Sequence, residues 1–162
     1  MSTPEEVDAE RRKIGAALAK VASGIYVATA RVDDELVGML CSFVEQCSFE
    51  PPMISLAVGT DRAILQALDG HSLFGLHILS KENNALMKAF SRPGDSFEGL
   101  ELVENLFEIP QIADAYAFLA CKVAGRLVCG DHILYTAEVF DGELQHPGQE
   151  PMVRIRANGF KY

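Results

Sequence analysis

A run of small and hydrogen-bonding side chains interrupts two apolar segments in the first third of the chain. The run, GMLCSFVEQCSFEPPMISLAV, places Cys41, Ser42 and Gln46 among aliphatic residues and then breaks at two prolines. Backbone N–H groups and hydroxyls in such a run can bind the polar edge of a ligand, and small side chains let that ligand approach closely. The segment is therefore either one wall of a binding site or a core strand that tolerates a few polar residues.

Two other places carry side chains that could bind a ligand. Arg62 lies at the predicted start of a helix over 61–70, where free N–H groups and the helix dipole attract a phosphate. Its guanidinium can bind two phosphate oxygens at once. Asp131 and His132 follow Gly130 in a predicted hairpin turn, in which the carboxylate can orient the imidazole. A solvated arginine and an ordinary turn are the alternatives.

The composition argues against several classes of function. The 162 residues have a formal net charge of −9, which disfavours nucleic acid and anionic membranes as partners, because both bind basic surfaces. No apolar run approaches the roughly 20 residues of a membrane span, and the N-terminus lacks the pattern of a signal peptide. We therefore expect a cytoplasmic protein with no membrane partner.

Motifs for metals and for several common cofactors are missing from the sequence. It has no glycine-rich dinucleotide or phosphate loop and no hydrolase nucleophile motif, and its four histidines and four cysteines lack metal-ligand spacing. We expect no metal site. If the protein is an enzyme, a bound cofactor must supply the reactive group.

Helices are predicted at three places. Thr3 and Glu6 form a capping box that starts a first helix within residues 1–23. Further helices are expected over 61–70 and, with Ser80 as the N-cap, over 81–91. The first helix carries an apolar stripe that we expect to pack on the body of the protein, formed by Val7, Ile14, Leu18 and Val21.

Alternation of apolar and polar residues predicts strands over most of the remaining chain. The expected strands lie at 25–30, 36–49, 53–59, 72–79, 117–129, 132–139 and within 151–162. Residues 92–116 have no sustained period, so we expect an irregular excursion with a short strand near Phe107. Many short antiparallel strands avoid open edges best by closing on themselves. The prediction is one domain over 1–162, mainly β, built as a small β-barrel with peripheral helices.

Several of these segments resemble the flavin reductase-like, FMN-binding split-barrel family. The polar run is similar to that family's flavin-contacting strand and the double proline after it, and ALAKVASGIYVATAR is similar to its opening helix and strand. ACKVAGRLVCGDHILYTAEV, which resembles the family's C-x-V and G-D-H motifs, is the most specific match. The segments MLCSFVEQCSFEPP, DRAI and VRIRANGFKY are similar to the flavin reductase-like module of cyanobacterial flavodiiron, or diflavin, proteins.

The resemblance implies a split β-barrel that binds FMN, with FAD as the alternative, at the interface of a homodimer. It implies that His132, oriented by Asp131, lies where a nicotinamide ring stacks on the flavin, and that His77 stands where the family commonly has asparagine. The implied flavin contacts are Met39, Leu40, Cys41, Ser42, Gln46, Arg62, Ala63, His77, Ser91, Arg92 and Asp131.

The reaction that the resemblance implies is hydride transfer from NAD(P)H to the flavin, followed by passage of the electrons to an acceptor such as a redox protein. An alternative is a non-enzymatic carrier with tightly bound FMN, for which the acidic surface would suit a basic redox partner. A third possibility is a related split barrel that binds haem or deazaflavin F420.

Overall fold

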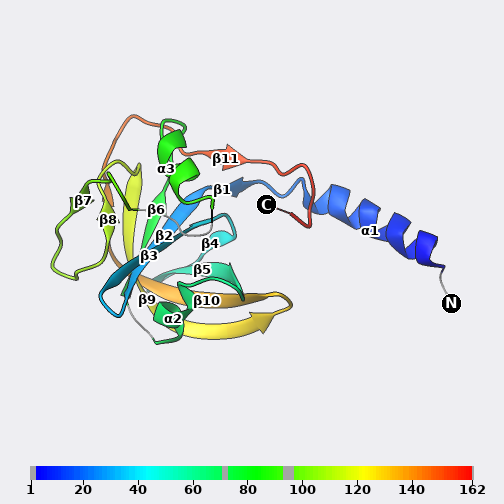
Figure 1. Cartoon of the computed structure of the whole chain (residues 1–162), viewed down its shortest axis with the longest axis horizontal. Coiled ribbons are helices and arrows are strands. Elements are labelled where there is room, and N and C mark those ends of the chain that lie inside the picture. Colours follow the sequence, from blue (N-terminus) through cyan, green and yellow to red (C-terminus); the bar gives the residue numbers. More distant parts are fainter. Residues whose placement is uncertain (1–2, 71–72, 93–96, 162) are drawn as a thin grey trace. The chain divides into compact units, whose positions relative to one another are not determined.

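The structure, a computed structural model, describes residues 3–70, 73–92 and 97–161 (Figure 1). The chain forms two compact units: residues 24–152 make the larger one, and residues before 24 together with those after 152 make the smaller one. The expectation of a single domain over 1–162 stays a prediction. No helix within the described ranges is long and apolar enough to cross a membrane.

The smaller unit begins with the predicted helix, α1 (Pro4–Leu18). Its capping box is confirmed, because the Thr3 hydroxyl accepts the N–H of Glu6 and the Glu6 carboxylate accepts the N–H of Thr3. The four side chains of its apolar stripe keep between 41% and 59% of their surface exposed, and packing of this stripe on the body of the protein stays a prediction. Those side chains are Val7, Ile14, Leu18 and Val21.

The C-terminal tail packs along α1 within this unit. The N–H of Gly159 donates to the carbonyl of Gly15 at 2.9 Å, and the Arg156 guanidinium donates to the carbonyl of Leu18 at 3.3 Å. A side chain at Gly15 would place its Cβ 2.8 Å from the Phe160 ring, so the close approach of tail and helix requires glycine there. The short strands β1 (Ser23–Gly24) and β11 (Val153–Arg154) pair with each other.

The larger unit is built on one seven-stranded antiparallel sheet, whose strand order is β3-β2-β6-β9-β10-β5-β4. Its strands are β2 (Tyr26–Val32), β3 (Glu35–Cys41), β4 (Val44–Phe49), β5 (Pro52–Gly59), β6 (Leu73–Ile78), β9 (Ala117–Cys129) and β10 (His132–Leu144). The two edge strands, β3 and β4, are joined by only Ser42 and Phe43, so the sheet must curl until its edges approach. The result is the split β-barrel that the sequence predicts.

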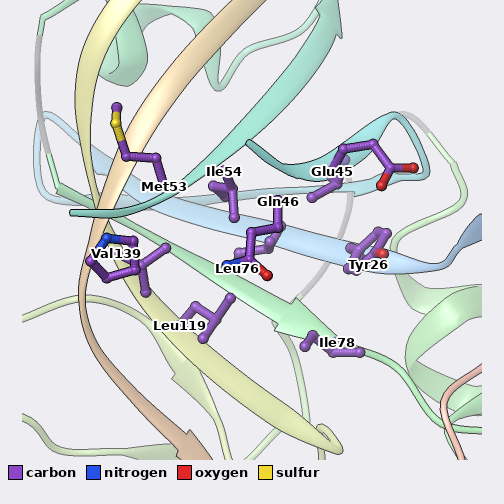
Figure 2. A pocket seen from close by; sticks show the side chains of 11 residues that line it. Tyr26, Glu45, Gln46, Met53, Ile54, Leu76, Ile78, Leu119 and Val139 are labelled. Atoms are coloured by element: carbon purple, nitrogen blue, oxygen red, sulfur yellow. The ribbon is translucent and has the colours of Figure 1, made fainter. Parts of the chain in front are cut away.

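Alternate residues of the strands fill the barrel. The predicted inward face of β5 is confirmed, since Ile54, Leu56 and Val58 are all buried. Tyr135 of β10 and Phe74 of β6 are the largest fully buried side chains of this core. Near the start of β5, side chains from β2, β4, β5, β6, β9 and β10 line a cavity of about 330 Å³ (Figure 2).

Two helices in the larger unit are shorter than the sequence suggests. α2 (Leu65–Asp69) begins four residues after Asp61, so the prediction that it starts there is wrong. α3 (Asn84–Ala89) follows Asn83 and not the expected N-cap Ser80. The Asn83 side chain instead accepts the N–H of Ser80 at 2.8 Å and so stabilises the turn before the helix.

The described part of the excursion after α3 is more ordered than expected. In place of one short strand near Phe107, it contains β7 (Leu102–Val103) paired with β8 (Gln111–Ile112), and Phe107 lies in the turn between them. The buried residues Ile112 and Ala115 join Phe90 in a second apolar cluster. Residues 93–96 of the predicted excursion lie outside the described residues.

Candidate functional site

Three segments that carry predicted site residues meet at one end of β5. The Phe43 carbonyl, in the β3–β4 link, accepts the N–H of Ala57 at 3.0 Å. After β5, the N–H of Thr60 donates to the carbonyl of Asp131 at 3.3 Å, and β10 begins with His132 opposite Gly59. The polar run and the predicted hairpin turn, far apart in the sequence, therefore border one site.

His132 is held on two sides. Its Nδ1 lies 2.7 Å from the Asp131 carboxylate, and this hydrogen bond is the main reason why the pKa of Asp131 lies below its usual range. The ring of Phe43 lies against the imidazole, with 5.5 Å between ring centres and 49° between planes. The predicted orienting role of Asp131 thus has the necessary geometry.

Phe43 was not among the predicted site residues. Its residue type does not single it out, because Phe43 is one of several apolar residues in the polar run. Its place in the two-residue link between the edge strands could have drawn attention to it, because a link that short must lie at the end of the barrel.

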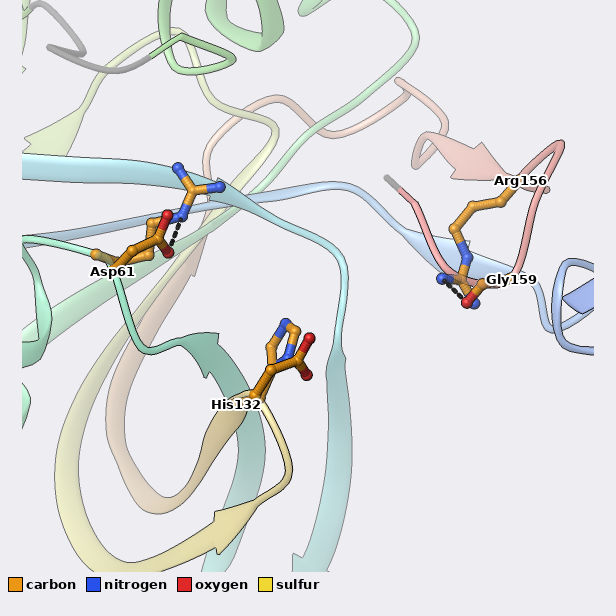
Figure 3. A network of polar contacts seen from close by, with 6 residues as sticks. Asp61, His132, Arg156 and Gly159 are labelled. Carbon is orange, nitrogen blue, oxygen red and sulfur yellow. Dashed lines mark hydrogen bonds and ion pairs between the residues drawn. The ribbon is translucent and has the colours of Figure 1, made fainter. Parts of the chain in front are cut away.

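Arg62 lies in the turn between β5 and α2. Its N–H donates to the Gly59 carbonyl at 3.3 Å, and its guanidinium Nε lies 3.5 Å from the carboxylate of Asp61 (Figure 3). The expected support from a helix dipole is absent, because α2 starts only at Leu65 and has five residues. Arg62 can still bind an anion through its partly exposed guanidinium, next to the exposed Ala63.

The end of β3 lies beside the end of α3. Met39 and Cys41 are buried, and burial raises the pKa of the Cys41 thiol to about 12, so this cysteine is no nucleophile. Leu40 donates its N–H to the carbonyl of Phe90 at 3.1 Å, which brings the exposed residues after Phe90 close to β3. These residues are Ser91, whose hydroxyl donates to the Lys88 carbonyl at 3.0 Å, and Arg92.

Gln46 lies away from His132. It pairs with Ile54 on β5, whereas His132 pairs with Gly59, so roughly 16 Å of extended strand separates the two positions. Its side-chain amide donates to the carbonyl of Ser48 at 3.2 Å. Gln46 lines the cavity that Figure 2 shows.

His77 has a structural environment. The ring is fully buried, Nε2 accepts the N–H of Ile112 at 2.9 Å, and Nδ1 therefore carries the proton that it donates to the Val27 carbonyl at 3.1 Å. Burial lowers the pKa of His77 to about 4, so the ring is neutral. Both ring nitrogens are engaged within the fold, where His77 attaches β8 to the barrel, and a contact of His77 with a flavin stays a prediction.

The groups that the structure assembles fit an aromatic, anionic cofactor. Arg62 and the segment around Ser91 offer donors for a phosphate, and Phe43 with His132 offers ring surfaces at the end of the barrel. At Gly130, whose φ is +61°, an added Cβ would meet no atom within 4 Å, so the turn leaves open space beside it. Among the described residues no cluster of three or more histidine, cysteine or acidic side chains could hold a metal ion.

Comparisons with known proteins identify the family. Residues 18–160 match the model of the flavin reductase-like domain. A diflavin flavoprotein A 1 from Synechocystis sp. is 36% identical over 133 residues, which cover 79% of this chain but only 23% of the relative. The chain thus spans about a quarter of the length of the curated relatives it matches.

Two solved structures share the fold over most of the chain. The NADH:FAD oxidoreductase SgcE6 from Streptomyces globisporus has a TM-score of 0.77 at 25% identity, with 99% of this chain and 94% of that chain covered. The flavin reductase PheA2 has a TM-score of 0.73 at 26% identity, with 85% and 88% covered. With a matching domain model over nearly its whole length and relatives more than 30% identical, the chain belongs to the flavin reductase-like family.

Proposed function

We propose that the protein is a flavin reductase that binds FMN, or FAD, and transfers a hydride to it from NAD(P)H. The observation that carries the proposal is the convergence of Phe43, His132 and Arg62 at one end of a barrel of the flavin reductase-like family. Both solved relatives are named for reactions on flavin, one of them with NADH.

The residues around the site have distinct roles in this proposal. Arg62, with Ala63, binds the phosphate, and Ser91 and Arg92 bind it or the ribityl chain. Leu40, Ser42 and the backbone of the buried Met39 and Cys41, at the end of β3, would contact the flavin ring. A contact with Gln46, which lies farther along β4, stays a prediction.

His132 places the nicotinamide in this proposal. A bound flavin would supply the redox chemistry by accepting a hydride from the nicotinamide. Asp131 accepts the Nδ1 proton of His132 and so fixes the plane of the imidazole, and the tilted ring of Phe43 packs against it. No acid or base of the protein is needed for this step. The protein's contribution is to orient the rings and to exclude water.

A non-enzymatic electron carrier is the second candidate. The module makes up only about a quarter of its curated relatives, so in those proteins it accompanies other segments. The net charge of −9 would suit docking of a basic redox partner. For either function we propose a homodimer, in keeping with the family resemblance.

A steady-state assay separates the two candidates. Purified protein is mixed with FMN or FAD and with NADH or NADPH, and the oxidation of the nicotinamide is followed by its absorbance. The reductase proposal expects catalytic turnover with at least one pair, reduced strongly by Asp131→Asn and His132→Ala. Tight flavin binding without turnover would reject the reductase in favour of the carrier.

A further inference from the structure

Asp69, the last residue of α2, accepts hydrogen bonds from two neighbouring strands. The Tyr135 hydroxyl on β10 donates to its Oδ1 at 2.6 Å, and the Arg126 Nε on β9 donates to the same oxygen at 2.9 Å. Tyr135 and Arg126 lie directly opposite each other in the β9–β10 pair, so both bonds reach the same point of that hairpin. We call these two bonds the α2 anchor, because they attach the end of α2 to the hairpin that carries His132.

The bond from Tyr135 is the stronger part of the α2 anchor. Tyr135 is fully buried, whereas the side chains of Arg126 and Asp69 are 43% and 45% exposed. Burial raises the pKa of Tyr135 to about 12, so the hydroxyl keeps the proton that it donates to Asp69 at neutral pH. Loss of the Asp69 carboxylate would take this acceptor from a buried hydroxyl, whereas loss of Arg126 would remove a contact that solvent already screens.

The turn that carries Arg62 is attached to the same hairpin at both of its ends. At its start, the N–H of Thr60 donates to the carbonyl of Asp131 at 3.3 Å. At its other end, the N–H of Leu65, the first residue of α2, donates to the carbonyl of Arg62 at 3.1 Å, and α2 continues to the α2 anchor. Arg62 therefore lies on a segment that the β9–β10 hairpin holds from two sides.

Apolar packing by itself would leave the orientation of α2 weakly defined. Ala67 and Leu68 are buried in the core of the barrel, but apolar contacts have no directional preference. A helix of five residues is also too short to be fixed by such contacts along its length. The two directional hydrogen bonds at Asp69 supply the missing constraint.

We propose that Asp69 is a positioning residue, which holds Arg62 in place relative to His132 through the α2 anchor. The inference rests on the proposed function, in which Arg62 binds the flavin phosphate and His132 places the nicotinamide. A phosphate anchor that moves relative to the rest of a site loses much of its effect on binding. The contribution of Asp69 should therefore appear only with a flavin that carries a phosphate.

Titration of the protein with FMN and with riboflavin, which lacks the phosphate, tests this expectation by the quenching of flavin fluorescence. Asp69→Ala should raise the Kd for FMN about 10-fold and change the Kd for riboflavin less than about 2-fold. Asp69→Asn keeps an acceptor oxygen and should restore most of the FMN affinity. Gln66→Ala is the matched control and should change neither Kd, since the exposed Gln66 side chain of α2 donates to Asp33 at 3.4 Å, outside the α2 anchor.

A double variant distinguishes positioning from a merely structural role. In the Arg62→Ala background, Asp69→Ala should raise the Kd for FMN by less than about 2-fold more, because the α2 anchor acts through Arg62. Urea titration measures the stability of each variant separately. A structural role would lower stability and leave the ratio of FMN to riboflavin affinity unchanged. An unchanged ratio, or independent and additive losses of FMN affinity in the double variant, would overturn the proposal.

Amide hydrogen exchange of the flavin-free protein separates this inference from the proposed function. The N–H groups of Thr60 and Arg62 should exchange about 10-fold faster in Asp69→Ala and at the natural rate in Gln66→Ala. If these amides respond as expected but the natural chain binds no flavin, the proposed function is rejected and the attachment of the Arg62 turn through Asp69 stands. If FMN binds through Arg62 but Asp69→Ala changes neither these amides nor the affinity, the inference alone is rejected.

Discussion

Protonation of His77 should loosen the attachment of β8 to the barrel. The neutral ring accepts the N–H of Ile112 at Nε2, so a proton added at Nε2 would face that donor and would leave a positive charge buried in the fold. The pKa of His77 is lowered from 6.5 to about 4 by burial, because the charged ring is poorly solvated inside the fold. In the unfolded chain the ring returns to its ordinary pKa.

The sign and the size of the effect follow from this difference. Below pH 6.5 the unfolded chain binds a proton at His77 that the folded chain binds only near pH 4, so the unfolded state gains stability as the pH falls. The contribution of His77 to stability is fully present above pH 6.5 and is lost as the pH falls toward 4. Between pH 7 and pH 4 the free energy of unfolding should decrease by about 3 kcal/mol from this residue alone.

Urea unfolding followed by circular dichroism measures the effect, since the chain contains no tryptophan for fluorescence. His77→Asn is the matched variant. The asparagine side chain offers both a donor and an acceptor, and it does not titrate in this range. The difference in unfolding free energy between natural chain and variant should change by about 3 kcal/mol from pH 7 to pH 4. Parallel pH profiles would refute the assignment of a buried neutral His77.

Three further substitutions test other parts of the structure. Arg62→Ala should raise the Kd for FMN about 10- to 100-fold, measured by isothermal titration, and should leave the melting temperature unchanged. An unaltered affinity for FMN would contradict the role of Arg62 in binding the phosphate. Gly38→Ala should lower the free energy of unfolding by about 1–3 kcal/mol in urea titrations, because its Cβ would lie 2.5 Å from the Phe90 ring. An unchanged midpoint would show that the Phe90 ring can move aside without cost. Tyr135→Phe should cost about 1–3 kcal/mol in the same assay, since it removes the 2.6 Å hydrogen bond to the Asp69 carboxylate, and a neutral result would mean that the bond contributes nothing net.

Local signals in the sequence predicted most of the barrel. The capping box at Thr3 and the period-two pattern of β5 and β9 lie in single stretches of chain, so composition and spacing reveal them directly. The bounds of β9, residues 117–129, were predicted as the structure has them. Helix starts were harder, because Asp61 and Ser80 have cap-forming side chains but lie in turns that precede α2 and α3.

The features that the sequence did not reveal depend on contacts between distant segments. The burial of His77 depends on Ile112, 35 positions later in the chain, and the ring contact of Phe43 with His132 joins two separate strand connections. What covers the apolar stripe of α1 is likewise not given by local signals, since an apolar periodicity shows that a face can be buried without showing what buries it.

The most direct test of the central claim is an absorption spectrum of the protein mixed with FMN, followed by anaerobic titration with NADH. We expect saturable flavin binding that Arg62→Ala weakens, and bleaching of the flavin bands by a stoichiometric amount of NADH or NADPH. A protein that takes up no flavin at micromolar concentrations, or whose bound flavin neither nicotinamide reduces, would contradict it.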